Sequence, residues 1–243
     1  MLGMPKLTMP NKQRRAVLNH ILCRSNHVIT FLFLFASMLC ALPVYACYSG
    51  LVIIPTADTI GKGQCGVELQ MDVVMSTTKA DTQLINTEFG IGDRMELGVD
   101  FDESEGAEAT KMINAKLVLA NIYSAKTSIA AGVCNLANEI KSNPFLVATK
   151  DCNEFRVHFG GIHIDGKQRW FAGVDHALND RLIFMADYTN GLDNYSSLGF
   201  GYQISSSKSI LAGVVFPNGS GDSLFTMHFV MNNPINSLIG VKK

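Results

Sequence analysis

The sequence predicts an all-β protein, an antiparallel up-and-down transmembrane β-barrel of about 12 strands that follows a cleaved signal peptide. Three observations indicate this fold: a basic and then apolar leader, an alternation of apolar and polar residues along nearly all of the remaining chain, and connections that alternate between short and long. Alternation with a period of two is typical of β-strands. Short turns at one end and longer loops at the other are typical of barrels in bacterial outer membranes.

The leader, residues 1–46, has the composition of a secretory signal peptide. It holds five basic and no acidic residues, and its apolar stretch at 28–42 precedes Val-Tyr-Ala at 44–46, with small residues at both positions that a signal peptidase reads. We therefore expect cleavage before Cys47. Two alternatives stay open: an uncleaved membrane anchor, since the apolar stretch is nearly long enough to span a bilayer, and a lipidated Cys47.

The domain organisation follows from this leader. We expect a signal peptide at 1–46, an N-terminal lead-in segment at 47–63, the barrel at 64–232 and a C-terminal tail at 233–243. The leader removes five of the 20 Lys and Arg and none of the 21 Asp and Glu, so the mature chain carries a net charge of about −6. This charge argues against a nucleic-acid partner, and the length suits a single domain. Outer-membrane lipid and, during insertion, the barrel-assembly machinery are the expected partners.

The first six strands are expected at 64–76, 82–91, 94–103, 110–120, 125–134 and 144–150. The first strand alternates most clearly, with Glu68, Gln70 and Asp72 set against Val67, Leu69, Met71 and Val73. The tight turn Gly92-Asp93 opens the third strand, and a polar turn followed by alternation is the signature of an antiparallel hairpin.

The other six strands are expected at 154–164, 168–177, 181–190, 194–204, 208–216 and 222–232. Asn179-Asp180 opens the strand at 181–190, just as Gly92-Asp93 opens the third strand. An Asp follows each of these turns at the same distance, Asp100 after the first and Asp187 after the second. Strands of about ten residues cross a bilayer at a tilt.

The connections alternate in length along the chain. The short ones are 92–93, 121–124, 151–153, 179–180 and 205–207, whereas most of the others are longer, such as 77–81, 104–109, 135–143, 191–193 and 217–221. An even number of strands places both ends of the barrel on the short-turn side, as outer-membrane barrels require.

Each strand then has an apolar face toward lipid and a polar face toward the lumen. The lumen is expected to be lined by both signs of charge, from Glu68, Asp72, Glu88, Arg94, Glu96, Asp100, Lys116, Arg156, Asp175, Arg181, Asp187 and His228. Two rings of aromatic residues mark the lipid face, Phe101, Trp170, Tyr188, Phe216 and Phe225 near the long loops and Phe89, Phe155, Tyr202 and Phe229 near the short turns. A soluble sandwich shows the same alternation, and its apolar face is the core.

Four cysteines remain after cleavage. The equal spacing of Cys47 to Cys65 and of Cys134 to Cys152 suggests two disulfides in an exported protein, and neither spacing suits a metal site. The predicted topology, however, places Cys134 at the long-loop end and Cys152 in a short turn at the other end. We therefore expect that those two are not joined, which leaves Cys47 and Cys152 as the alternative pair.

We assign no catalytic, cofactor-binding or metal-binding residue. The acidic segment 100–108 matches no calcium loop and is interpreted as a solvated loop. Arg156 and His158 share a polar face with Asp175 and His176 on the next strand, with a bulge at 160–161 expected to restore the register. We interpret them as a lumenal ion pair, because no Gly-x-Ser-x-Gly nucleophile motif occurs. The Gly-rich stretches at 90–92 and 219–221 precede strands, which argues against phosphate cradles. On the lumenal face, Gly98 is expected to tolerate serine.

Several segments resemble a known family: 50–58 (GLVIIPTAD), 86–94 (NTEFGIGDR), 145–149 (FLVAT), 169–175 (RWFAGVD) and 177–181 (ALNDR). They are similar to the YjbH-like outer-membrane β-barrel proteins, which are associated with exopolysaccharide production, and to related porin-like barrels. The resemblance spans most of residues 50–231 and rests on turns and strand starts. It implies a barrel and a polysaccharide or a small solute as partner.

The functional expectation is a non-enzymatic outer-membrane barrel, acting as a narrow pore or as an envelope component linked to exopolysaccharide export. One alternative is a soluble periplasmic β-sandwich or lipocalin-like binding module. A second is a hydrolase embedded in a barrel.

Overall fold

The computed structural model describes residues 50–105, 110–137 and 141–234, which belong to one compact unit within 44–243. The predicted signal peptide, the first residues of the predicted lead-in and nearly all of the C-terminal tail lie outside the described residues. In the described part of the chain, no helix is long and apolar enough to cross a membrane.

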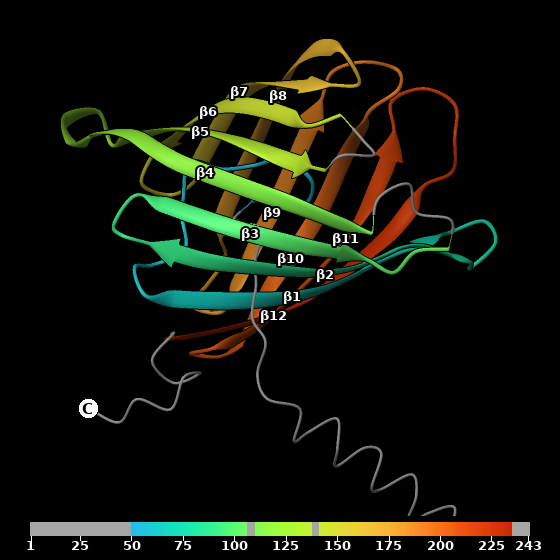
Figure 1. Ribbon diagram of the computed structural model, residues 1–243, viewed down its shortest axis with the longest axis horizontal. Helices are drawn as coiled ribbons and strands as arrows, with labels where there is room; N and C mark the ends of the chain where they lie inside the picture. Colours follow the sequence, from blue (N-terminus) through green and yellow to red (C-terminus); the bar gives the residue numbers. More distant parts are fainter. Residues whose placement is uncertain (1–49, 106–109, 138–140, 235–243) are drawn as a thin grey trace, which may run out of the picture. The chain divides into compact units, whose positions relative to one another are not determined.

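Twelve antiparallel strands close into a barrel in which each strand pairs with the next and β12 pairs with β1 (Figure 1). The strands are β1 (Gln64–Val74), β2 (Ala80–Ile91), β3 (Met95–Asp102), β4 (Lys111–Ile122), β5 (Thr127–Leu136), β6 (Asn143–Asp151), β7 (Arg156–Ile164), β8 (Lys167–Ala177), β9 (Leu182–Thr189), β10 (Tyr195–Ser205), β11 (Lys208–Pro217) and β12 (Leu224–Pro234), and a short 3₁₀ turn, η1 (Tyr123–Ala125), joins β4 to β5. The predicted fold and strand count are confirmed, and the predicted strand bounds differ from these by only a few residues.

The β7–β8 hairpin departs from its prediction in one respect. Arg156 is opposite Asp175, as expected, but the pairing runs without a shift to Ile164 opposite Lys167, so the predicted bulge at 160–161 is wrong. Asp165 and Gly166 have φ angles of 51° and 84°, the left-handed conformation of a two-residue hairpin turn. Because this turn sets the register directly, Ile162 is opposite Arg169 and faces the lumen, whereas Trp170 faces outward.

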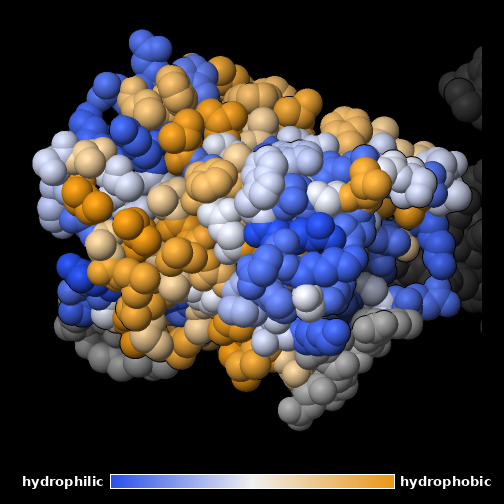
Figure 2. Space-filling view, turned by 90° about the horizontal axis from the view of Figure 1, so that it is seen from above, coloured by the Kyte–Doolittle hydropathy of each residue, from blue (hydrophilic) through white to orange (hydrophobic). Residues whose placement is uncertain are grey.

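The two faces of the barrel have opposite chemistry. Charged and polar side chains are buried in the lumen, whereas large apolar side chains of the same strands are exposed on the outside, such as Leu69, Leu117, Leu146 and Phe159. In Figure 2, apolar side chains cover a broad area of the face, with hydrophilic ones grouped beside them. A closed barrel with its polar face inside is not a sandwich, so the soluble β-sandwich alternative is wrong.

The predicted aromatic rings lie on the outer face. None of the nine residues is buried, and seven have the exposure of large surface residues, Phe89, Phe155, Trp170, Tyr188, Tyr202, Phe216 and Phe225. Phe159, Trp170 and Tyr188 form a row of contacting rings across β7, β8 and β9. Phe159 and Phe229 lie near the middles of β7 and β12, whereas the other aromatic residues lie toward strand ends, which suits the interface between lipid and water.

The structure separates two of the cysteines as expected. Cys134 is opposite Asn143 at the first residue of β6, and Cys152 follows the last residue of the same strand. A strand of nine residues spans far more than the reach of a disulfide.

Candidate functional site: a lumen occupied by the chain itself

The lumen of the barrel contains residues 50–60 of the same chain, here called the inner segment. In Figure 1 the blue start of the described chain lies between the near and far walls of the barrel. Most of residues 51–57 are nearly inaccessible, with exposed fractions of 6% for Leu51, 5% for Val52, 1% for Ile54, 2% for Thr56 and 2% for Ala57. The sequence predicted a lead-in to the barrel at 47–63, and it gave no indication that this segment enters the lumen.

The inner segment begins with a tight reversal of the chain. Gly50 and Pro55 form an isolated antiparallel bridge, and the backbone N–H of Leu51 donates to the carbonyl of Ile54 at 2.9 Å. Proline suits this position because it has no N–H to donate and favours extended backbone. The reversal directs the N–H groups at 52 and 53 away from the segment itself, toward the barrel wall.

Asp187 on β9 binds this reversal. Its Oδ2 accepts the backbone N–H of Val52 at 2.9 Å and that of Ile53 at 3.1 Å, and its Oδ1 accepts the hydroxyl of Ser197 on β10 at 2.5 Å. Hydrogen bonds to a carboxylate are stronger than those between neutral groups. The carboxylate therefore holds the tip of the inner segment on the β9–β10 wall.

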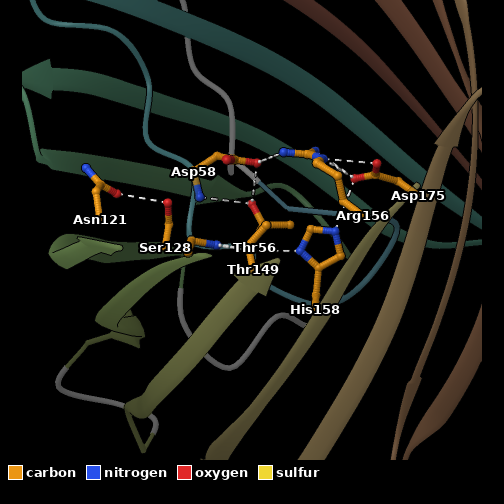
Figure 3. A network of polar contacts seen from close by, with 9 residues as sticks. Thr56, Asp58, Asn121, Ser128, Thr149, Arg156, His158 and Asp175 are labelled. Carbon is orange, nitrogen blue, oxygen red and sulfur yellow. Dashed lines mark hydrogen bonds and ion pairs between the residues drawn. The ribbon is translucent and has the colours of Figure 1, made fainter. Parts of the chain in front are cut away.

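A second group of side chains holds residues 56–58 on the β6–β8 wall (Figure 3). Thr149 Oγ1 accepts the backbone N–H of Ala57 at 2.9 Å and lies 2.9 Å from His158 Nδ1, so its hydroxyl proton is available to the histidine. His158 Nε2 lies 3.1 Å from Asp175 Oδ2. These contacts form a continuous chain from the inner segment through three buried side chains of the wall.

Arg156 completes the second attachment. Its Nη2 lies 2.6 Å from Asp175 Oδ2 and its Nη1 lies 2.8 Å from Asp58 Oδ2, so one guanidinium joins a carboxylate of the wall to one of the inner segment. The predicted ion pair between Arg156 and Asp175 is thus present. What the sequence did not reveal is the third member, Asp58, which is 98 positions away from Arg156.

Thr149, His158 and Asp175 resemble a hydroxyl, imidazole and carboxylate triad in their order of contact. The hydroxyl, however, already accepts the N–H of Ala57, and the three residues have exposed fractions of only 5%, 1% and 3%. A nucleophile must reach the reacting carbon of a substrate. These contacts favour a structural role, in which the triad holds the inner segment.

Apolar packing adds to these polar attachments. Leu51, Val52, Ile54 and Ala57 form one buried cluster with inward side chains of the wall, Val118, Ala130, Cys134, Phe145, Val147, Ile162, Phe171, Met185 and Val215. Two glycines leave room for it: a Cβ at Gly173 would lie 2.6 Å from Leu51 Cδ1, and one at Gly199 would lie 2.8 Å from Val52 Cγ2. The inner segment therefore rests on the wall from β4 to β11.

The remaining wall is acidic. Six buried carboxylates and amides lie on β1 to β3, namely Glu68, Asp72, Asn86, Glu88, Glu96 and Asp100, and Asn114 and Lys116 follow on β4. Lys116 offsets part of this charge, because its Nζ lies 2.8 Å from Glu96 Oε1. His228 Nδ1 lies 3.0 Å from Glu68 Oε1. Glu96 also accepts the N–H of Ile60 at 2.8 Å, so it fixes the end of the inner segment.

Two cavities flank the inner segment. One, of about 370 Å³, lies at the short-turn end and is lined by Asn179, Arg181, Gln203 and Asn232 among others. The second, of about 300 Å³, lies toward the long-loop end, between the tip of the inner segment and the acidic wall. Leu51 and Glu68 line both cavities. One side chain of the inner segment and one of the wall therefore border both cavities.

Most of the predicted lumenal residues lie where the alternation places them. Nine have exposed fractions between 1% and 8%, Glu68, Asp72, Glu88, Glu96, Asp100, Lys116, Asp175, Asp187 and His228, and Arg156 is partly buried. Arg94 and Arg181 are exposed, because each lies in a turn just before its strand begins, and Arg181 still lines the short-turn cavity. Among the described residues, no group of three or more His, Cys, Asp or Glu could hold a metal ion.

The acidic segment 100–108 divides in the structure. Asp100 is buried in the lumen, and its Oδ2 accepts the Nδ2 of Asn114 at 2.5 Å, whereas Glu103 and Glu105 are exposed. Residues 106–109 lie outside the described part of the chain. The prediction of one solvated loop is therefore wrong for Asp100, whose place in the β3 alternation turns it inward.

No family model matches this chain, and no curated protein matches it by sequence. Among solved structures, the KdgM porin is similar with a TM-score of 0.50 and 10% identity, over 68% of this chain and 97% of that porin, as is the KdgM porin in complex with disordered oligogalacturonate. A triple-mutant porin of Rhodopseudomonas blastica has a TM-score of 0.39 and 14% identity, over 63% of this chain and 56% of the porin. At these identities the similarity to the KdgM porin shows the porin-like barrel fold. The resemblance to YjbH-like proteins stays a prediction.

Proposed function

We propose that this chain is an outer-membrane pore, non-enzymatic, in which the inner segment narrows the lumen and through which small cationic or neutral solutes pass. The observation that carries this proposal is the pair of cavities that share Leu51 and Glu68 inside a closed barrel. Residues 1–46 act in this proposal as the cleaved signal peptide for export. The barrel follows them, and a tail ends the chain.

The outer surface supports the membrane location. Large apolar side chains with exposed fractions near one half, such as Leu117, Leu146 and Leu198, recur on successive strands. Soluble monomers rarely expose apolar surface over so wide an area. A lipocalin-like module would instead hold its apolar face inside, where this barrel has buried carboxylates.

The charge of the lumen supports the choice of solute. Carboxylates outnumber cations on the wall from β1 to β4, where Lys116 is the one buried lysine or arginine among the described residues. The KdgM porin was solved with oligogalacturonate, which is an anion. An anionic chain in this lumen would face like charge in a medium of low dielectric, which is unfavourable. We therefore favour cations and neutral solutes over acidic polysaccharides.

The test combines membrane fractionation with conductance of the purified mature chain in planar bilayers. We expect the protein in the outer-membrane fraction, small unitary conductance, and a reversal potential under a salt gradient that shows preference for cations. The control variant Asp193→Asn, in an exposed loop, should leave this preference unchanged. A chain that fractionates as a soluble protein, or that inserts without conductance, would contradict the proposal.

A link to exopolysaccharide export rests on the family resemblance alone. It concerns the process that the pore serves, so its test is separate. Deletion of the gene should reduce the exported polysaccharide, and a variant that is inserted but blocked should not restore it. If the deletion strain exports a normal amount, the link is wrong while the pore stands.

A further inference from the structure

We infer that the cavity toward the long-loop end is a binding site for small amphipathic cations, that is, for an ammonium or guanidinium group that carries an apolar body. This inference rests on the proposed pore function and names the class of solute that the pore would hold. It is argued from a row of acceptors on one side of the cavity and an apolar surface on the other.

Three neighbouring strands place acceptors in one row across the wall. Glu68 on β1 is opposite Asn86 on β2, and Asn86 is opposite Asp100 on β3. All three residues line the cavity, which has a volume of about 300 Å³, and their exposed fractions are 5%, 3% and 7%. The row therefore places two carboxylates and one amide along one side of the cavity.

Two oxygens of this row have no hydrogen-bond donor within the described residues. Asn86 donates its Nδ2 to Glu68 Oε1 at 2.7 Å, and its Oδ1 is buried without a partner. Asp100 accepts the Nδ2 of Asn114 through Oδ2, and its Oδ1 is likewise buried without a partner. Burying an acceptor without a donor costs free energy, and the cost is larger for the charged carboxylate of Asp100 than for the amide of Asn86. A cationic group in the cavity beside this row would offset the negative charge of the buried carboxylates.

The opposite side of the cavity is apolar. It is formed by the tip of the inner segment, Leu51, Val52, Ile53 and Pro55. Ile53 keeps an exposed fraction of 37%, unlike its neighbours Val52 at 5% and Ile54 at 1%. A bare metal ion would gain nothing from this side, and a hydrocarbon body would bury apolar surface against it. The two sides together fit an amine with a short alkyl chain.

The probe is hexylammonium, titrated calorimetrically into the purified, detergent-solubilised mature protein, with hexanoate and hexanol as controls for charge. We expect hexylammonium to bind at one site, hexanol more weakly and hexanoate not at all. Asp100→Asn keeps the shape of the side chain and removes its charge, so hexylammonium affinity should fall by about tenfold or more. The matched control Asp193→Asn changes an exposed carboxylate outside the lumen and should bind as the unaltered protein does.

A second variant leaves the acidic wall unaltered. Ile53→Lys places an ammonium at the partly exposed residue of the inner segment that lines the same cavity. It should abolish hexylammonium binding while the thermal unfolding transition persists. Retained binding in Ile53→Lys, unchanged binding in Asp100→Asn, or equal binding of hexanoate would each overturn the inference. Conductance without hexylammonium binding would overturn the site and leave the pore proposal intact. Binding without conductance would support the site and contradict the pore proposal.

Discussion

Asp187 connects the tip of the inner segment to two strands of the wall through three hydrogen bonds to one carboxylate. We expect Asp187→Ala to raise the mean conductance, because the N–H groups of Val52 and Ile53 lose their acceptor. Leaving buried donors unpaired costs about 1–3 kcal/mol, enough to shift the inner segment toward detached states. Single-channel recordings measure this. Asp151→Ala, at an exposed strand end, is the control, and equal conductance in both variants would show that the inner segment does not limit flow.

A second residue gives a pH dependence outside the membrane-spanning strands. Asp193, in the β9–β10 loop, accepts Lys167 Nζ at 2.7 Å and also pairs with Arg169, and the hydrogen bond from Lys167 lowers its pKa. A lowered pKa in the folded state stabilises the pair at pH values above the unfolded pKa, and this is lost as pH falls through the folded pKa. Hydrogen exchange of the loop amides should therefore quicken in acid, and Asp193→Asn should show no such step.

Gly98 contradicts the expectation that this position tolerates serine. It faces the lumen as predicted, but a Cβ there would lie 2.9 Å from Glu88 Cγ and 3.0 Å from the carbonyl oxygen of Thr87. Serine is therefore not a silent replacement. The alternation predicts which way a residue points, and it contains no information on how closely the side chain of the neighbouring strand covers it.

Among the elements, the strands could be read from sequence and the inner segment could not. Alternation and turn residues act locally, so Gly92-Asp93 and Asn179-Asp180 indicate their hairpins without reference to the rest of the chain. Residues 50–58 show neither the period of a strand nor that of a helix. The wall residues that accept their N–H groups are 92 to 135 positions away. The one available signal was the apolar run at 51–54, which favours burial and does not indicate against which part of the barrel.

Substitutions at two glycines, Gly173 and Gly161, test whether the inner segment limits conductance. Gly173 lies beneath it, and a Cβ added there would lie 2.6 Å from Leu51 Cδ1 and 2.7 Å from Ile54 Cδ1, whereas a Cβ at Gly161 on β7 would meet nothing nearer than 3.6 Å. We expect Gly173→Leu to displace the inner segment and raise conductance. Gly161→Leu adds the same side chain on the outer face and should leave conductance unchanged. If both variants conduct as the unaltered chain does, the inner segment tolerates displacement without opening a path.

For the whole molecule, the outer face is the test of lipid contact. Leu117 lies at the middle of β4 with an exposed fraction of 45%, and Leu117→Arg should destabilise the folded barrel by about 2–4 kcal/mol, the cost of a cation near the bilayer midplane. Leu192, in the β9–β10 loop, is 79% exposed, so Leu192→Arg should be nearly neutral. Denaturant unfolding in lipid vesicles measures both. Equal effects would argue against a lipid-facing outer surface.

The orientation of the whole barrel gives a further prediction. A protease site inserted at Ser142, in the long connection before β6, should be cut on intact cells, because long loops face outward in this class of barrel. A site inserted between Ser206 and Ser207, in the short turn between β10 and β11, should be protected. The reverse pattern would mean that the barrel is inverted or absent.

The sequence separation of the inner segment's contacts has a consequence for assembly. Asp187 and Thr149, which accept its N–H groups, come 135 and 92 residues later in the chain, and the β1–β12 pairing joins the first strand to the last. Contacts between such distant positions form late, since the chain between them must be ordered first. We therefore expect a maturation step in which barrels that have just closed leak ions until the inner segment settles on its wall, so that conductance after insertion declines with time.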